Sequence, residues 1–227
     1  MQHRTVGDLM THGVVLARRD TPFKNIVSLL SENEVTALPV VDDLGHPVGV
    51  VSEADLLRTV AARPDPAGLP RSPYASNGAR AANDEVTAEQ LMSAPAVCAR
   101  PGWTVVEAAR LMDTEGVKRL PVVDESETLV GIVSRGDLLR VFLRRDDALR
   151  DEIAGDVLVR TLGLAPSDVA VEVRDGRVTL KGRVETEEII PVIERLCRGV
   201  DGVVSVDSAL HRRSNETPGG PADRRLS

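Results

Sequence analysis

The decapeptide GIVSRGDLLR at residues 131–140 has a near copy in GVVSEADLLR at residues 49–58. In each copy a short β-branched run ends in serine and leucines at helical spacing follow, which predicts a strand that leads directly into a helix. When the comparison is extended outward, residues 6–60 align with residues 88–142 without a gap and with roughly 20 identities. The chain therefore carries an internal duplication.

The rest of each copy predicts the same order of elements. The stretches FKNIVSLLSENEV and VVEAARLMDTEGV place apolar residues at helical spacing. Each is followed by LPVV and then by VGVV or VGIV, which are short β-branched runs separated by a polar turn. We therefore expect a strand, a helix, two neighbouring strands and a helix in each copy. A unit of about 55 residues buries little apolar surface by itself, so the two copies should pack against each other.

The C-terminal part of the chain predicts a separate small unit. DDALRDEIAGDVLVRTLGL has the spacing of an amphipathic helix, and the runs DVAVEV and RVTLKG flank the turn Asp175–Gly176, which is a strong hairpin signal. TEEIIPVIERLCRGV predicts a second helix, and Pro191 leaves open where that helix begins. DGVVSVDSAL predicts a final strand with Val204 and Val206 on one face.

These patterns predict an α+β fold class and divide the chain into five parts. The stretch between the two copies is rich in Pro, Ala, Gly and Ser and has no apolar period, which is typical of a flexible linker. The predicted parts are a first repeat at 1–62, a linker at 63–87, a second repeat at 88–145, a small α+β domain at 146–211 and a disordered tail at 212–227.

Composition excludes several classes of function. The net charge of −7 and the presence of only one Trp, one Tyr and two Phe among 227 residues speak against a nucleic-acid partner. The N-terminus lacks the apolar core of a signal peptide, and no apolar run approaches the roughly 18 residues that span a bilayer. We therefore expect a cytoplasmic protein without a transmembrane segment. Cys98 and Cys197 lie far apart and near no histidine, so we expect buried thiols and neither a disulfide nor a metal site.

The strand-to-helix junction has two compatible interpretations. Serine followed three residues later by aspartate is a capping-box pattern, which occurs as Ser52 with Asp55 and as Ser134 with Asp137. A capping box explains both residues without any ligand. The same helix start also offers backbone N–H groups, a hydroxyl and a carboxylate that are suited to a ribose and a phosphate.

The duplicated pattern of LPVVD followed by VGhhSxxD, where h is an apolar residue, resembles a tandem pair of CBS domains, the regulatory fold named for cystathionine beta-synthase. The resemblance covers residues 6–60 and 88–142. It implies a module with pseudo-twofold symmetry and two clefts between the repeats, and a homodimer of such modules. It also implies that an adenosine-containing ligand such as AMP, ADP, ATP, NAD or S-adenosylmethionine occupies a cleft.

The resemblance implies a well-equipped first cleft. In it Asp137 would hold the ribose hydroxyls, Ser134 would lie on the phosphate side and Ile132 beside the base. A basic residue often precedes LPVVD in this family, and Lys118 and Arg119 hold that place here; their alternative role is that of a solvated pair at a helix end. The opposing wall would consist of Thr11, Val14, Val35 and Thr36.

The pseudo-symmetric second cleft lacks a basic residue, because Ala37 replaces Arg119. The loss of a charge-assisted contact costs about 1.5 to 3 kcal/mol, so we expect this cleft to bind a phosphorylated ligand more weakly or not at all. The resemblance places the following residues in it: Asp55, Ser52, Val50, Ser93, Val97 and Val117.

The C-terminal unit resembles a BON domain through the hairpin VEVRDGRVTLKGRV and the strand GVVSV. That family is associated with phospholipid surfaces or partner proteins. Residues 146–211 carry a net charge of −6, which an anionic lipid surface repels, so we expect a protein partner rather than lipid.

No catalytic constellation is present, since GxGxxG, HExxH, GxSxG and the GK[ST] ending of a P-loop are all missing. We therefore expect a regulatory protein rather than an enzyme, one that senses an adenine nucleotide and relays its presence to the BON-like domain or to a partner. The alternatives are a ligand-free scaffold that dimerises and presents BON domains, and a peripheral lipid-binding protein.

Overall fold

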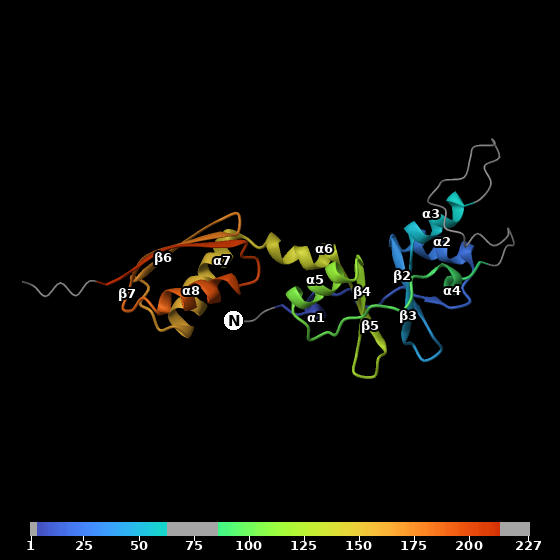
Figure 1. The fold of residues 1–227 in the computed structure, drawn as a ribbon, viewed down its shortest axis with the longest axis horizontal. Coiled ribbons are helices and arrows are strands. Elements are labelled where there is room, and N and C mark those ends of the chain that lie inside the picture. The colour runs from blue at the N-terminus through green and yellow to red at the C-terminus, as the bar shows by residue number, and fades with distance from the viewer. Residues whose placement is uncertain (1–3, 63–85, 214–227) are drawn as a thin grey trace, which may run out of the picture. The chain divides into compact units, whose positions relative to one another are not determined.

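The computed structural model describes residues 4–62 and 86–213. These residues form two compact units, one from Arg4 to Leu139 and one from Arg140 onward (Figure 1). Most of the predicted linker and tail, residues 63–85 and 214–227, lie outside the described residues.

The first unit contains both repeats. Its first half comprises α1 (Val6–Leu9), β1 (Ala17–Arg18), α2 (Phe23–Glu32), β2 (Ala37–Val41), β3 (Pro47–Ser52) and α3 (Glu53–Ala61). Its second half comprises α4 (Ala88–Leu91), α5 (Val105–Thr114), β4 (Arg119–Val123), β5 (Leu129–Ser134) and α6 (Arg135–Leu139).

The predicted order of elements needs two corrections. Each repeat opens with a short helix, α1 or α4, which the prediction missed because four residues are too few to show a helical period. The first strand of the second repeat is reduced to a single bridge between Ala99 and Val122, where the first repeat has β1 parallel to β2. The two antiparallel pairs, β2 with β3 and β4 with β5, confirm the predicted neighbouring strands.

The short helices are exchanged between the repeats. Val6 of α1 is fully buried in the core of the second repeat, beside Leu120 and Val133, and Ala88 of α4 is fully buried in the core of the first. α1 contacts β5 and α6, which belong to the second repeat (Figure 1). The exchange makes the two repeats one folding unit.

Two glycines of the repeated junction make room for this exchange. A side chain at Gly49 would lie 2.5 Å from the sulfur of Met92 and 2.8 Å from the carbonyl oxygen of Ser93. A side chain at Gly131 would collide with Met10 in the same way. Glycine is favoured at both positions because the segment that follows α1 or α4 crosses directly over the strand.

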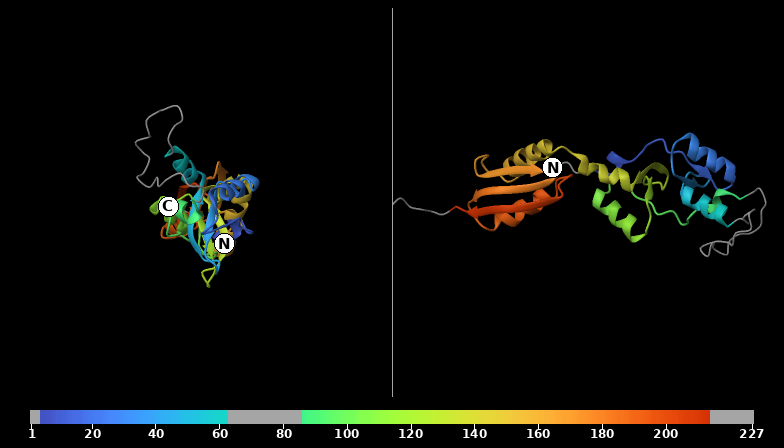
Figure 2. Two further views of the ribbon diagram at one scale, coloured as in Figure 1. Left: turned by 90° about the vertical axis from the view of Figure 1, so that its right-hand side faces the viewer. Right: turned by 90° about the horizontal axis from the view of Figure 1, so that it is seen from above.

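The second unit is a three-stranded sheet with helices packed on one face (Figure 1 and Figure 2). Its elements are the 3₁₀-helix η1 (Arg140–Leu143), α7 (Asp146–Glu152), the π-helix η2 (Ile153–Thr161), β6 (Val169–Arg174), β7 (Arg177–Val184), α8 (Ile189–Arg198) and β8 (Ser205–Arg212). The strand order is β6-β7-β8, with β7 antiparallel to β6 and parallel to β8.

The predicted hairpin is confirmed, and the carboxylate of Asp146 fastens its turn. Asp175 and Gly176 both have positive φ angles, and their N–H groups donate to Asp146 over 2.7 and 2.9 Å. Pro191 is the third residue of α8, where a helix has no partner for the N–H that proline lacks.

Two expectations for this unit are wrong in detail. The helix predicted over 146–164 changes from α to π geometry at Ile153 and ends at Thr161. Val204 precedes β8 and is 60% exposed, while its neighbour Val203 is buried in the core instead. Val204 lies between the turn at Gly202 and the start of β8 at Ser205, so the alternation of the strand does not extend to it.

Candidate functional site

The two serine–aspartate pairs form the capping boxes that the sequence predicts. Ser134 donates its N–H and its hydroxyl to Oδ2 of Asp137 over 2.9 and 2.6 Å, and Ser52 does the same to Asp55 over 2.8 and 2.6 Å. Each aspartate therefore fixes the direction in which a helix leaves the sheet. Both boxes form without a ligand, so they do not by themselves distinguish a binding site from a helix cap.

Arg119 joins the two repeats at the first cleft. It begins β4 directly opposite Ser134, and its guanidinium donates a hydrogen bond to the hydroxyl of Thr36 in the first repeat. Among the described residues this is the one hydrogen bond that its side chain makes. A guanidinium carries five N–H donors, so the group can hold Thr36 and an anion together.

A continuous series of contacts links most of the residues predicted for this cleft. Thr11 and Ile132 exchange backbone hydrogen bonds of 2.9 and 3.1 Å, and Ile132 lies two residues before Ser134 on β5. Lys118 is exposed, and its carbonyl oxygen accepts the N–H of Arg135 at the start of α6.

Two of the predicted wall residues lie apart from that series. Val35 is half-buried and packs against the core of the first repeat. Val14 is half-buried as well, and no hydrogen bond within the described residues links it to the cleft.

The second cleft has the same capping box and backbone bridge as the first but lacks a residue equivalent to Arg119. Val50 and Ser93 exchange backbone hydrogen bonds of 3.0 and 2.9 Å, as Thr11 and Ile132 do. Ala37 lies opposite Ser52 and is only 5% exposed. The remaining predicted wall residues, Val97 and Val117, are half-buried and pack against the core of the second repeat.

Asp55 has a further partner on its own helix. The guanidinium of Arg58 forms an ion pair with Oδ1 of Asp55, three residues earlier. The carboxylate of Asp55 is 6% exposed and is bonded through both oxygens. A ribose in the second cleft would have to compete with both partners.

Helix length does not distinguish the two clefts. The α-helix that follows Ser52 spans nine residues, and the five residues of α6 after Ser134 are followed directly by the four residues of η1. The basic residues Lys118 and Arg119 are therefore the main electrostatic difference between the clefts.

The remaining polar groups have structural roles. The pKa of Asp42 lies below its usual value because the carboxylate accepts the N–H groups of His46 and Leu44. Within residues 4–62 and 86–213, no group of three or more His, Cys, Asp or Glu side chains is arranged to hold a metal ion. Within the same residues no helix is long and apolar enough to cross a bilayer.

Comparison with known protein families matches residues 6–62 and 88–144 to the CBS domain. The chain belongs to the CBS-domain family. Residues 145–213 match the BON domain, so the resemblances stated from sequence are confirmed for both parts. The α+β fold class is confirmed with them.

Relatives share the CBS pair in different contexts. Uncharacterized protein MJ1426 of Methanocaldococcus jannaschii is 28% identical over 155 residues, which cover 61% of this chain and 90% of the relative. CBSX2 from the chloroplast of Arabidopsis thaliana is 32% identical over 152 residues, which cover 62% of this chain and 64% of the relative. A homoserine O-acetyltransferase of Methanococcoides burtonii is 28% identical over 62% of this chain, and this match spans only 25% of that enzyme.

Solved structures show the same fold. The CBS domain pair of protein MJ0100, determined with 5'-methylthioadenosine and S-adenosyl-L-methionine, is 22% identical, with a TM-score of 0.50 over 62% of this chain and 97% of that one. A structure of CBSX2 in complex with AMP is 33% identical, with a TM-score of 0.47 over 61% of this chain and 96% of that one.

Proposed function

We propose that the CBS pair binds a phosphorylated adenosine ligand in the first cleft and that its occupancy regulates the BON domain or a partner protein. The observation that supports this most directly is the position of Arg119. Its guanidinium lies opposite Ser134 on one repeat and bonds to Thr36 on the other, so a phosphate between them would contact both repeats.

The difference between the two clefts supports the choice of a phosphorylated ligand. Arg119 and the exposed Lys118 offer two positive charges, whereas Thr36 and Ala37 hold the equivalent places in the first repeat. A charge-assisted hydrogen bond is worth about 1.5 to 3 kcal/mol, so the first cleft is expected to bind a phosphate about tenfold to a hundredfold more tightly.

The proposed mechanism is a population shift. The two repeats are proposed to exchange between two relative arrangements, and a ligand that touches both repeats binds one arrangement more tightly. The ligand shifts the equilibrium toward that arrangement by the difference between its two binding free energies. The exchanged helices α1 and α4 couple the repeats, since each belongs to one repeat and packs in the core of the other. The change would then reach the BON domain through the chain that follows α6.

Matched aspartate variants test the proposal. Asp137→Ala and Asp55→Ala each remove one capping box, so both lose helix-cap stability of about 0.5 to 2 kcal/mol. AMP, ATP, NADH and S-adenosylmethionine are added to each variant and to the unaltered chain, and the shift in melting temperature is measured. We expect Asp137→Ala to abolish the shift and Asp55→Ala to leave it largely intact.

Equal loss in both variants would contradict the assignment of the ligand to the first cleft. If calorimetry detects no heat with any of the four compounds, the sensor function fails and the ligand-free scaffold is left. Co-sedimentation with anionic vesicles that survives high salt would instead favour peripheral lipid binding by the BON domain.

A further inference from the structure

The last strand of the BON domain leaves one long edge of the sheet open. β8 spans eight residues and pairs with β7 alone, and its other side receives no backbone hydrogen bond from any described residue. The strand contains no proline and no lysine, and its pairing with β7 has no shift of register. Prolines, lysines and bulges are among the features that keep sheet edges from pairing with other strands. β8 has none of these three, and its charged residues are Asp207 and Arg212.

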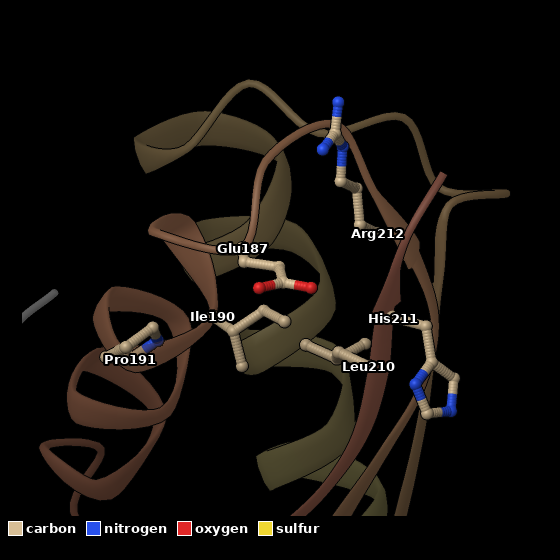
Figure 3. A pocket seen from close by; sticks show the side chains of 6 residues that line it. All are labelled: Glu187, Ile190, Pro191, Leu210, His211 and Arg212. Atoms are coloured by element: carbon tan, nitrogen blue, oxygen red, sulfur yellow. The ribbon is translucent and has the colours of Figure 1, made fainter. Parts of the chain in front are cut away.

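A hollow lies beside the C-terminal half of this strand. It has a volume of about 560 Å³ and lies between the start of α8 and the end of β8. Figure 3 shows the side chains of Ile190 and Leu210 pointing toward each other across it, with the carboxylate of Glu187 above them. Leu210 is buried and Ile190 is half-buried, and these two side chains form an apolar spot within a lining that is otherwise mostly polar.

The rim of the hollow carries two unpaired charges. Glu187 and Arg212 both line it, both are exposed, and neither side chain forms an ion pair or a hydrogen bond with another described residue. His211 points to the other side of β8 (Figure 3), as alternation along a strand requires. The hollow therefore combines the apolar pair Ile190 and Leu210 with one anion and one cation at its mouth.

We propose that an extended peptide segment of a partner protein adds to the open edge of β8 as a fourth strand and places one apolar side chain in this hollow. In strand addition, main-chain hydrogen bonds supply affinity and a pocket for alternate side chains supplies specificity. β8 offers both features, since its edge has free main-chain groups and the hollow lies beside it. Charge complementarity defines the occupant further, as an apolar residue flanked by charged residues of both signs that meet Glu187 and Arg212.

This inference deepens the partner-binding role proposed for the BON domain and rests on it. The nucleotide-induced melting shift remains a separate measurement on the CBS pair. Failure at the β8 edge therefore leaves the nucleotide site standing, and failure of the nucleotide site leaves the edge to be judged by the experiment that follows.

A phage-displayed library of random ten-residue peptides, selected against the full chain, provides the probe. We expect the recovered peptides to share one apolar position. With the tightest of them bound, amide hydrogen exchange at alternate residues of β8 should slow by about tenfold or more, because only every second N–H points to the open edge. Ile190→Ala should weaken its binding, measured by fluorescence anisotropy, by about fivefold or more.

Val159→Ala is the matched control, since Val159 is a 39% exposed apolar residue of the same domain outside the hollow. Its affinity for the peptide should equal that of the unaltered chain. The proposal is overturned if no peptide with a common apolar position is recovered, if β8 exchange is unchanged by the peptide, or if both variants weaken binding equally. In the free chain, alternate β8 amides could already be protected, and more strongly at higher protein concentration. That result would overturn the proposal, because the occupant of the edge would then be a second copy of this chain.

Discussion

Arg119 and Ala37 occupy equivalent positions in the two repeats, each opposite the serine of a capping box. The second cleft therefore serves as an internal control for the first. Both clefts contain a capping box and a backbone bridge, and only the first also contains the guanidinium of Arg119. Differences in binding between them can be attributed to few side chains. In the second cleft, the carboxylate of Asp55 is also engaged by an ion pair with Arg58.

The two cysteines should differ in reactivity at the residue scale. Cys197 is fully buried, and burial raises the pKa of its thiol to about 11. Burial also raises the pKa of Cys98, which is less deeply placed. Because the thiolate is the reactive form, iodoacetamide at mildly alkaline pH should modify Cys98 well before Cys197, as followed by mass spectrometry. Equal rates for both thiols in the folded chain would contradict the buried position of Cys197.

At the scale of elements, the exchanged helices decide which glycines are indispensable. Met10 and Met92 follow α1 and α4 and lie over Gly131 and Gly49 of the opposite repeat. The obstacles differ, however. The three atoms nearest to a side chain at Gly131 all belong to Met10, whereas those nearest to a side chain at Gly49 include the carbonyl oxygen of Ser93. A flexible side chain can move aside more readily than the backbone can.

We therefore predict that Gly49→Ala destabilises the chain more than Gly131→Ala, with a difference of about 1 kcal/mol or more in the free energy of unfolding. In the background of Met10→Ala, Gly131→Ala should become much less destabilising, because the two nearest obstacles, Sδ and Cγ of Met10, are gone. Met92→Ala should rescue Gly49→Ala only in part. Urea denaturation of the single and double variants measures these couplings, and full rescue in both pairs would contradict the role given to Ser93.

Local signals in the sequence predicted some elements well and others badly. The capping boxes and the Asp175–Gly176 hairpin depend on residues within a few positions of each other, and the structure confirms them. The exchange of α1 and α4 depends on packing between segments far apart along the chain, so no local sequence pattern predicts it. The hollow beside β8 likewise exists only once α8 and β8 have packed together.

The candidate site was predictable to a similar degree. The duplication identified which positions are equivalent, and the family resemblance indicated which of them face a cleft. The hydrogen bond from Arg119 to Thr36 and the ion pair of Arg58 with Asp55 are set by side-chain conformations, which spacing in a sequence does not determine.

At the scale of the whole molecule, the outer helices of the CBS pair suggest self-association. Leu57 and Val60 of α3 are 66% and 48% exposed, and Leu139 of α6 and Val106 of α5 are 62% and 55% exposed. We predict a homodimer through these helices, with a mass by sedimentation equilibrium of twice the 24.4 kDa of one chain. Leu57→Glu combined with Leu139→Glu should give a monomer, whereas Val159→Glu should not. A monomeric unaltered chain at all concentrations would refute the prediction.

The most direct test of the nucleotide site is a calorimetric titration of AMP into the full chain and into its Arg119→Ala variant. AMP is the first compound to use because it joins adenosine to a single phosphate, so it tests one phosphate contact at Arg119. We predict saturable binding to the unaltered chain and a dissociation constant about tenfold to a hundredfold higher for Arg119→Ala, since a charge-assisted contact to the phosphate is lost. Binding of equal strength in both proteins would contradict the assignment of the phosphate to Arg119.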